Sequence, residues 1–181
     1  VNAAAGETMV HGVEDGEVGL PAWSPDGARI AFSFNPTGGH HHGLFLLDPA
    51  TGDITPVLDD PAFLIDASWL STAKPACLDE STVLLAGQFH GASGLWRVDV
   101  PSGTVTEVGV WQAIQSGLSV TADGSLAVQT ATAIDGEISV VATSLGAQPE
   151  RRVVFDAGED AFDGAALASW QRIDATSGGF T

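Results

Sequence analysis

Short apolar runs alternate with turn residues along most of the chain. The clearest series consists of runs at 29–34, 43–48 and 53–58, separated by a Gly/His-rich loop and a Pro-Ala-Thr-Gly turn. Runs of this length, rich in Val, Ile, Leu, Phe and Thr and bounded by Gly, Pro and Asp, are typical of β-strands. No stretch combines apolar residues at helical spacing with helix caps. The pattern therefore predicts an all-β chain with almost no helix.

The same order of runs returns along the sequence. Trp23, Trp69, Val120 and Trp170 head successive copies and lie roughly 50 residues apart. Each full copy supplies four short strands, and four-stranded antiparallel units at this period match the blades of a β-propeller. We expect blades within approximately 20–60, 66–110 and 116–157, and part-blades at 7–12 and 165–172.

A turn motif marks the junction between the first two strands of a copy. In Ser24-Pro25-Asp26-Gly27, proline fixes φ, aspartate can accept backbone N–H groups, and glycine tolerates a positive φ. Asp123-Gly124 repeats the last two residues in the third copy. Both segments therefore predict tight turns with the same hydrogen bonds.

The blade count leaves the outer architecture open. Three blades and two part-blades do not close a ring, so residues 1–181 are either a piece of a larger propeller or one complete domain. In the second case the terminal strands would share one blade of a four-bladed ring. Completion by a second copy, or by further blades of the same chain, is also open, because an uncovered blade exposes apolar surface.

The first copy carries a specific family resemblance. Pro-Ala-Trp-Ser-Pro-Asp-Gly-x-Arg-Ile-Ala-Phe at 21–32, followed by Gly-Leu-Phe-x-x-Asp at 43–48, resembles the TolB-like (WD40-like) β-propeller repeat. The likeness weakens in the second and third copies. It implies a six-bladed propeller that serves as a binding platform, in an exported protein of the periplasm or exterior. Similar blades also form the N-terminal propellers of prolyl-oligopeptidase-like serine peptidases.

The net charge of the chain narrows the classes of partner that we expect. The chain has 23 acidic and 6 basic residues and a formal net charge of −17 at pH 7. Such a surface repels phosphate backbones and anionic membranes, so we expect no nucleic-acid partner. No apolar run reaches the ~18 residues of a membrane-spanning helix, so no membrane insertion is expected. The charge serves either solubility alone or the attraction of cations and basic partners.

Histidines gather where one face of the propeller is expected. If the strands of a blade are called a to d from the axis outward, the b–c loops and the d–a connections emerge on the same face. The five histidines fall in such segments, and imidazoles with carboxylates suit Zn²⁺, Ni²⁺ or Cu²⁺. Incidental histidines in a Gly-bounded loop are the alternative, because a short His run has no fixed ligand geometry. The candidate divalent-metal ligands are His11, His40, His41, His42 and His90.

Tryptophans divide into two groups. Trp23, Trp69 and Trp170 share one repeat position and are expected to pack between blades, as is Trp96. Trp111 breaks the pattern and lies in a d–a connection, where it either lines a pocket or caps the core. The candidate partner-binding face consists of Trp111, Asp59, Asp60 and Asp66.

Catalytic motifs are missing from the sequence. There is no Gly-x-Ser-x-Gly elbow, phosphate loop, dinucleotide fingerprint or Cys-based metal motif, and Cys77 is the single cysteine. We therefore expect no catalytic residue, no cofactor and no enzyme. The sequence favours a binding or scaffold module for a protein, peptide or glycan. The alternative is the substrate-gating propeller of a prolyl-oligopeptidase-like peptidase whose catalytic domain is not in this chain.

Overall fold

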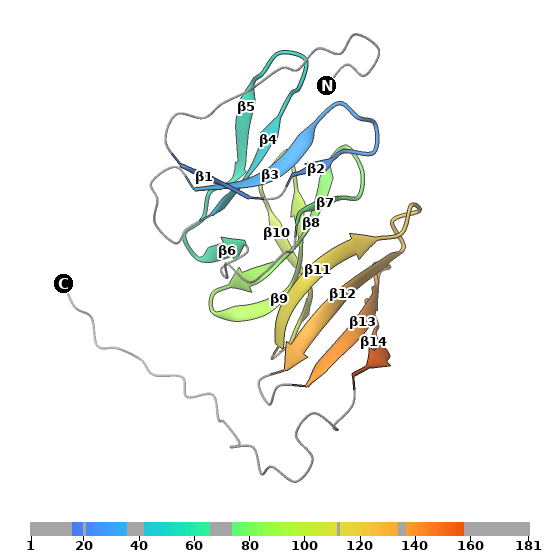
Figure 1. Cartoon of the computed structure of the whole chain (residues 1–181). Helices are drawn as coiled ribbons and strands as arrows, with labels where there is room; N and C mark the ends of the chain where they lie inside the picture. Colours follow the sequence, from blue (N-terminus) through green and yellow to red (C-terminus); the bar gives the residue numbers. More distant parts are fainter. Residues whose placement is uncertain are drawn as a thin grey trace, which may run out of the picture.

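The computed structural model describes residues 16–19, 21–35, 42–65, 74–111, 113–133 and 137–157. Within them the regular elements are all β-strands, arranged as three antiparallel sheets that follow one another along the chain (Figure 1). The prediction of an all-β chain built from four-stranded groups is confirmed. No helix able to cross a membrane occurs in this part of the chain.

The first blade has an interrupted inner strand. Two short segments pair with the same edge of one long strand, and two more strands follow outward in sequence order. Its strands are β1 (Glu17–Val18) and β2 (Ala22–Trp23), then β3 (Ile30–Asn35), β4 (Gly43–Leu47) and β5 (Ile54–Leu58).

The second blade repeats this interruption. Its two inner segments both pair with one long strand, and residues 66–73 lie between them in the sequence. Its strands are β6 (Phe63–Ile65) and β7 (Ala76–Cys77), then β8 (Thr82–Phe89), β9 (Ala92–Asp99) and β10 (Val105–Val110).

The third blade has a continuous inner strand. Its four strands pair in simple sequence order as an antiparallel meander. They are β11 (Ala113–Val120), β12 (Leu126–Ala133), β13 (Ile138–Ser144) and β14 (Arg151–Asp156). The predicted part-blades at 7–12 and 165–172 lie outside the described residues.

The predicted turns form as expected. Ser24 Oγ donates to Asp26 Oδ1 at 2.5 Å, and Thr121 Oγ1 donates to Asp123 Oδ1 at 2.6 Å. Gly27 and Gly124 follow with φ of 72° and 68°, in the left-handed region that favours glycine. The two turns are therefore the same structure built from different side chains.

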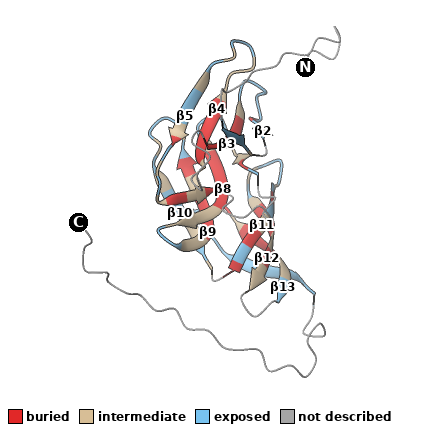
Figure 2. Cartoon of the chain, turned by 60° about the vertical axis from the view of Figure 1, so that its left-hand side comes forward, coloured by how far each residue is buried: buried red, intermediate tan, exposed pale blue. Residues whose placement is uncertain are grey.

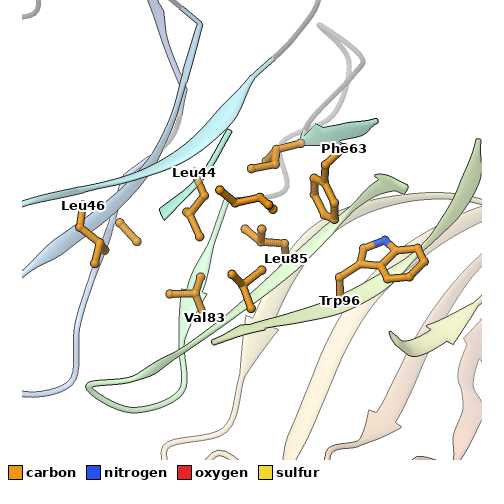
Figure 3. Close-up of a cluster of buried hydrophobic side chains, with 10 residues drawn as sticks. Leu44, Leu46, Phe63, Val83, Leu85 and Trp96 are labelled. Carbon is orange, nitrogen blue, oxygen red and sulfur yellow. The ribbon is translucent and has the colours of Figure 1, made fainter. Parts of the chain in front are cut away.

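The core between the first two blades is wholly apolar at its centre. Leu44 and Leu46 of β4 face Phe63, Val83 and Leu85 of the second blade, and all are at most 8% exposed (Figure 3). Trp96 closes this cluster, with its ring centroid 6.2 Å from that of Phe63. The prediction that Trp96 packs between blades is confirmed.

A second core joins the second and third blades. Leu84, Ala86 and Leu95 meet Leu118 and Ala127, and the buried residues of Figure 2 run through this zone. A hydrogen bond from Arg97 Nη2 to the carbonyl oxygen of Leu145 (2.8 Å) ties the two sheets together. Burial of such faces is the main stabilising contribution in stacked sheets.

The strand register corrects two expectations about the tryptophans. Opposite the second strand of each blade, Trp23 pairs with Ile30, Cys77 with Val83 and Val120 with Ala127. Cys77, and not Trp69, therefore occupies the repeat position in the second blade. Trp23 is 56% exposed and does not pack between blades. Trp69 and Trp170 lie outside the described residues.

Candidate binding surfaces

On the predicted face, two hydrogen bonds extend the sheet of the second blade into the connections before and after it. The β8–β9 turn contacts the connection between the first and second blades, through a hydrogen bond from His90 N to Ala62 O (3.1 Å). The connection between the second and third blades is held the same way, by Trp111 N donating to Ser93 O (2.9 Å). We call this side, which carries the b–c loops and d–a connections, the loop face.

His42 directly precedes β4 on the loop face. Its Nε2 is 3.7 Å from Glu17 Oε2 of β1, and its side chain is only 15% exposed. Its Nδ1 is buried without a hydrogen-bond partner among the described residues. The imidazole is therefore held at the blade edge beside one carboxylate.

His90 has a structural explanation. His90 and Gly91 form the two-residue turn between β8 and β9, with φ of 48° and 76°. Two positive φ values match the type I′ turn that suits the twist of a hairpin. The imidazole lies against Phe89, with ring centroids 4.2 Å apart. Packing and turn geometry account for its place without a ligand.

The metal site stays a prediction. Among the described residues, no group of three or more His, Cys, Asp or Glu side chains comes together. Three of the five candidate histidines and one candidate aspartate lie outside those residues. They are His11, His40, His41 and Asp66.

The connection after the first blade is ordered by one of the candidate aspartates. Asp60 Oδ1 accepts the backbone N–H of Ala62 at 2.8 Å, and its carbonyl oxygen accepts that of Phe63. Asp59 is exposed, and its Oδ1 lies 3.4 Å from where a side chain at Gly43 would begin. Of the two, Asp59 is the more exposed to solvent.

Trp111 packs on the edge of the blade core. It is half-buried against the apolar cluster between the second and third blades. The guanidinium carbon of Arg151 lies 4.8 Å from the centroid of its ring. A side chain at Gly109 would begin 2.5 Å from the indole, so the glycine makes room for it. The observed contacts are those of a core cap.

An axial groove opens where the inner strands of all three blades meet. Its volume is about 570 Å³, and β2, β7 and β11 line it. Trp23 forms an exposed wall, while Cys77, Leu118 and Val120 supply apolar surface. Lys74, the single lysine of the chain, also lines the groove. The sequence offered a signal for this site, because Trp23 lies between prolines on an inner strand.

Three carboxylates flank the groove. Asp26, Asp79 and Asp123 occupy the turn after the inner strand of each blade, adjacent in sequence to groove residues. Hydrogen bonds from Thr121 and then Ser125 lower the pKa of Asp123 to about 2, and the hydrogen bond from Ser24 lowers the pKa of Asp26. Burial acts to raise the pKa of Asp79, but hydrogen bonds from Ser81 and Thr82 outweigh it. All three therefore carry charge at neutral pH.

Solved structures share this arrangement of blades. TolB from Acinetobacter baumannii superposes with a TM-score of 0.62 at 16% identity, over 78% of this chain and 33% of that chain. The fold is that of a TolB-type β-propeller. A puromycin hydrolase structure matches with a TM-score of 0.58 at 20% identity, over 78% of this chain and 21% of that chain. One from a study of two prolyl endopeptidases matches at 0.57 and 14% identity, over 80% and 22%.

The likeness to TolB-type propellers is one of fold. No protein-family model and no curated protein sequence matches the chain. The chain spans about one third or less of the length of the three structures named above. Their activities and partners therefore belong to those proteins.

Proposed function

We propose that this propeller is a non-catalytic binding module that presents its loop face to a protein, peptide or glycan partner. The observation that carries the proposal is that the connections before and after the second blade are held to the sheet of that blade on this face. Hydrogen bonds from His90 to Ala62 and from Trp111 to Ser93 fix the part of the face that belongs to the second blade, whose sheet packs in both cores. A face fixed in this way loses little conformational entropy on binding, which favours affinity.

The test uses a charge reversal on the loop face. Asp59→Lys changes an exposed carboxylate there, while Asp53→Lys makes the same change in an exposed turn after β4, at the other end of the blade. Partners captured by crosslinking from host extract should be lost with Asp59→Lys and kept with Asp53→Lys. If both variants capture the same proteins as the unaltered chain, the loop face is not the binding surface. Intrinsic hydrolase activity of the purified chain would contradict the non-catalytic part.

A second candidate is the substrate-gating propeller of a serine peptidase. The observation favouring it is the fold similarity to prolyl endopeptidase and puromycin hydrolase structures, in which the matched part is 22% and 21% of the chain. The coding sequence that follows Thr181 separates the two candidates. A hydrolase domain with a Gly-x-Ser-x-Gly elbow there supports the peptidase. Further blades without such a domain support the binding module.

A further inference from the structure

The axial groove exposes a tryptophan that the fold does not use. Trp23 is 56% exposed, although its backbone is paired with Ile30 in the sheet of the first blade. Among the described residues its ring takes part in no aromatic pair or cation–π contact, whereas Trp96 and Trp111 both do. An exposed indole in a groove is a typical anchor for a ligand, because Trp combines large contact area with few rotatable bonds.

The other residues of the groove favour a ligand in extended conformation that makes only small contacts with the groove walls. Pro25 of the first blade and Pro75 of the second both line the groove, and a proline presents a fixed surface without an N–H donor. Leu118 and Val120 of β11 add a modest apolar surface. A volume of about 570 Å³ open to solvent holds a few residues of a peptide in extended form.

The charge around the groove selects the sign of the ligand. Asp26, Asp79 and Asp123 stand at one end of the three inner strands, and Lys74 is the single cation among the lining residues. Burial raises the pKa of the Cys77 thiol in the groove, a hydrogen bond with the backbone of Ala31 opposes this, and the charge of Asp26 adds a smaller upward contribution. The chain as a whole carries −17. A cationic ligand is therefore attracted both by the carboxylates beside the groove and by the net charge of the whole chain.

We infer that the axial groove binds a basic, extended peptide segment, with an arginine side chain lying on the Trp23 indole and its charge facing the turn carboxylates. Guanidinium groups stack on indole faces and are attracted by the ring quadrupole. The site is separate from the loop face, because the groove is bordered by the turns between the first and second strands of each blade. The inference therefore does not depend on the proposed function.

Binding of a defined probe tests the inference on the intact chain. The probe is a capped, fluorescein-labelled peptide of four Arg-Gly repeats, with four Glu-Gly repeats as its counterpart, measured by anisotropy at 0.15 M salt. The arginine peptide should bind and the glutamate peptide should not. Trp23→Leu should weaken binding about fivefold, the range of a partly exposed cation–π contact. Lys74→Gln should tighten it about twofold.

Matched variants separate groove binding from attraction to an acidic surface. Asp53→Asn removes one carboxylate from an exposed turn that does not line the groove, and it should change affinity far less than Trp23→Leu. Asp59→Lys on the loop face should have a small effect as well. Equal affinity of the unaltered chain and Trp23→Leu, or weaker binding of Lys74→Gln, overturns the inference. No binding of the arginine peptide overturns it too. Lys74 is exposed, so its variant stays informative if Trp23→Leu does not fold.

Discussion

The guanidinium carbon of Arg151 lies 4.8 Å from the centroid of the Trp111 ring. This contact joins the outermost strand of the third blade to the connection that precedes the first strand of that blade. The backbone N–H of Trp111 donates to Ser93 of β9, so the contact ties the outermost strand of the third blade to the second blade. Arg151→Gln should lower the free energy of unfolding by about 0.5–1 kcal/mol, the usual range for an accessible cation–π pair. Urea denaturation measures the change.

The neighbouring arginine is the control for this prediction. Arg152 pairs with Ala142 and its side chain points to the other side of the sheet. Arg152→Gln should therefore leave stability nearly unchanged. A double-mutant cycle with Trp111→Leu should give a coupling energy close to the loss seen for Arg151→Gln alone. Zero coupling would show that the two side chains act independently.

The a–b turns could be predicted from the sequence because their chemistry is local. Asp-Gly at 26–27 and at 123–124 sets the same hydrogen bonds and the same positive φ within a few residues. The apolar runs were equally informative, since each run became a strand in the predicted order. Position within the blade followed from the repeat, as the equivalence of Phe45 and Trp96 on corresponding strands of neighbouring blades shows.

The exposure of Trp23 in the groove could not be predicted in the same way, and neither could the residue of the second blade that is equivalent to Trp23. Trp69 matched the sequence pattern of the repeat, but Cys77 of β7 is the residue that faces Val83, as Trp23 faces Ile30 in the first blade. The sequence between two inner segments can differ in length from blade to blade without a change in the apolar pattern. Trp23 was expected in the core because Trp is usually buried, yet an inner strand borders the propeller axis, where no further sheet covers it.

A glycine in the third blade should be sensitive to substitution for a purely conformational reason. Gly124 has φ of 68°, and a side chain placed there would meet nothing within 4 Å. Gly124→Ala should therefore cost about 1 kcal/mol, the penalty of the left-handed region, with no steric contribution. Gly146 is the matched control, since its surroundings are equally open and it has no positive φ. Gly146→Ala should leave the urea midpoint unchanged, and equal effects of both variants would exclude this explanation.

Acid should weaken the third blade through Asp123. The folded-state pKa of this carboxyl is about 2, below the ordinary value of 3.8, because Thr121 and Ser125 donate hydrogen bonds to it. A lowered pKa means that the ionised form is favoured in the folded state. Its contribution is complete above pH 3.8 and is lost as pH falls towards 2. Thermal melts between pH 5 and 2 should show a smaller decline for Asp123→Asn.

A second variant isolates the hydrogen bond in that turn. Thr121→Val keeps the carboxylate but removes its strongest donor. The pKa of Asp123 should rise towards 3.8, and the acid dependence of the melting temperature should flatten as it does for Asp123→Asn. An unchanged acid profile in both variants would assign the acid sensitivity to other carboxylates.

Blade stacking should dominate stability. Leu95 is completely buried between the second and third blades, beside Leu84 and Leu118. Leu95→Ala should lower the free energy of unfolding by about 2–5 kcal/mol, through lost transfer free energy and the cavity left behind. Ile114→Ala removes a similar volume at a side chain that is 58% exposed, so its effect should be much smaller. Comparable losses at the two positions would mean that the blades do not unfold through this interface.

The outward face of the third blade should drive self-association. Phe155 pairs with Val140 as Leu58 pairs with Leu44, so the two side chains hold equivalent places in the first and third blades. Leu58 is 7% exposed under the second blade, whereas Phe155 is 62% exposed. Ile114 and Ile138 widen the same patch. Apolar surface gathered on an uncovered sheet favours contact between copies.

Phe155→Ser should therefore reduce the concentration-dependent increase in mass seen by light scattering. The free energy of unfolding should change by less than about 0.5 kcal/mol, because an exposed side chain contributes little to the core. Val18→Ser provides the comparison, since Val18 is 54% exposed on β1 of the first blade, away from this patch. If Val18→Ser suppresses association as strongly, general surface hydrophobicity causes it. If only Phe155→Ser does, copies of the chain meet through the face that a further blade would cover.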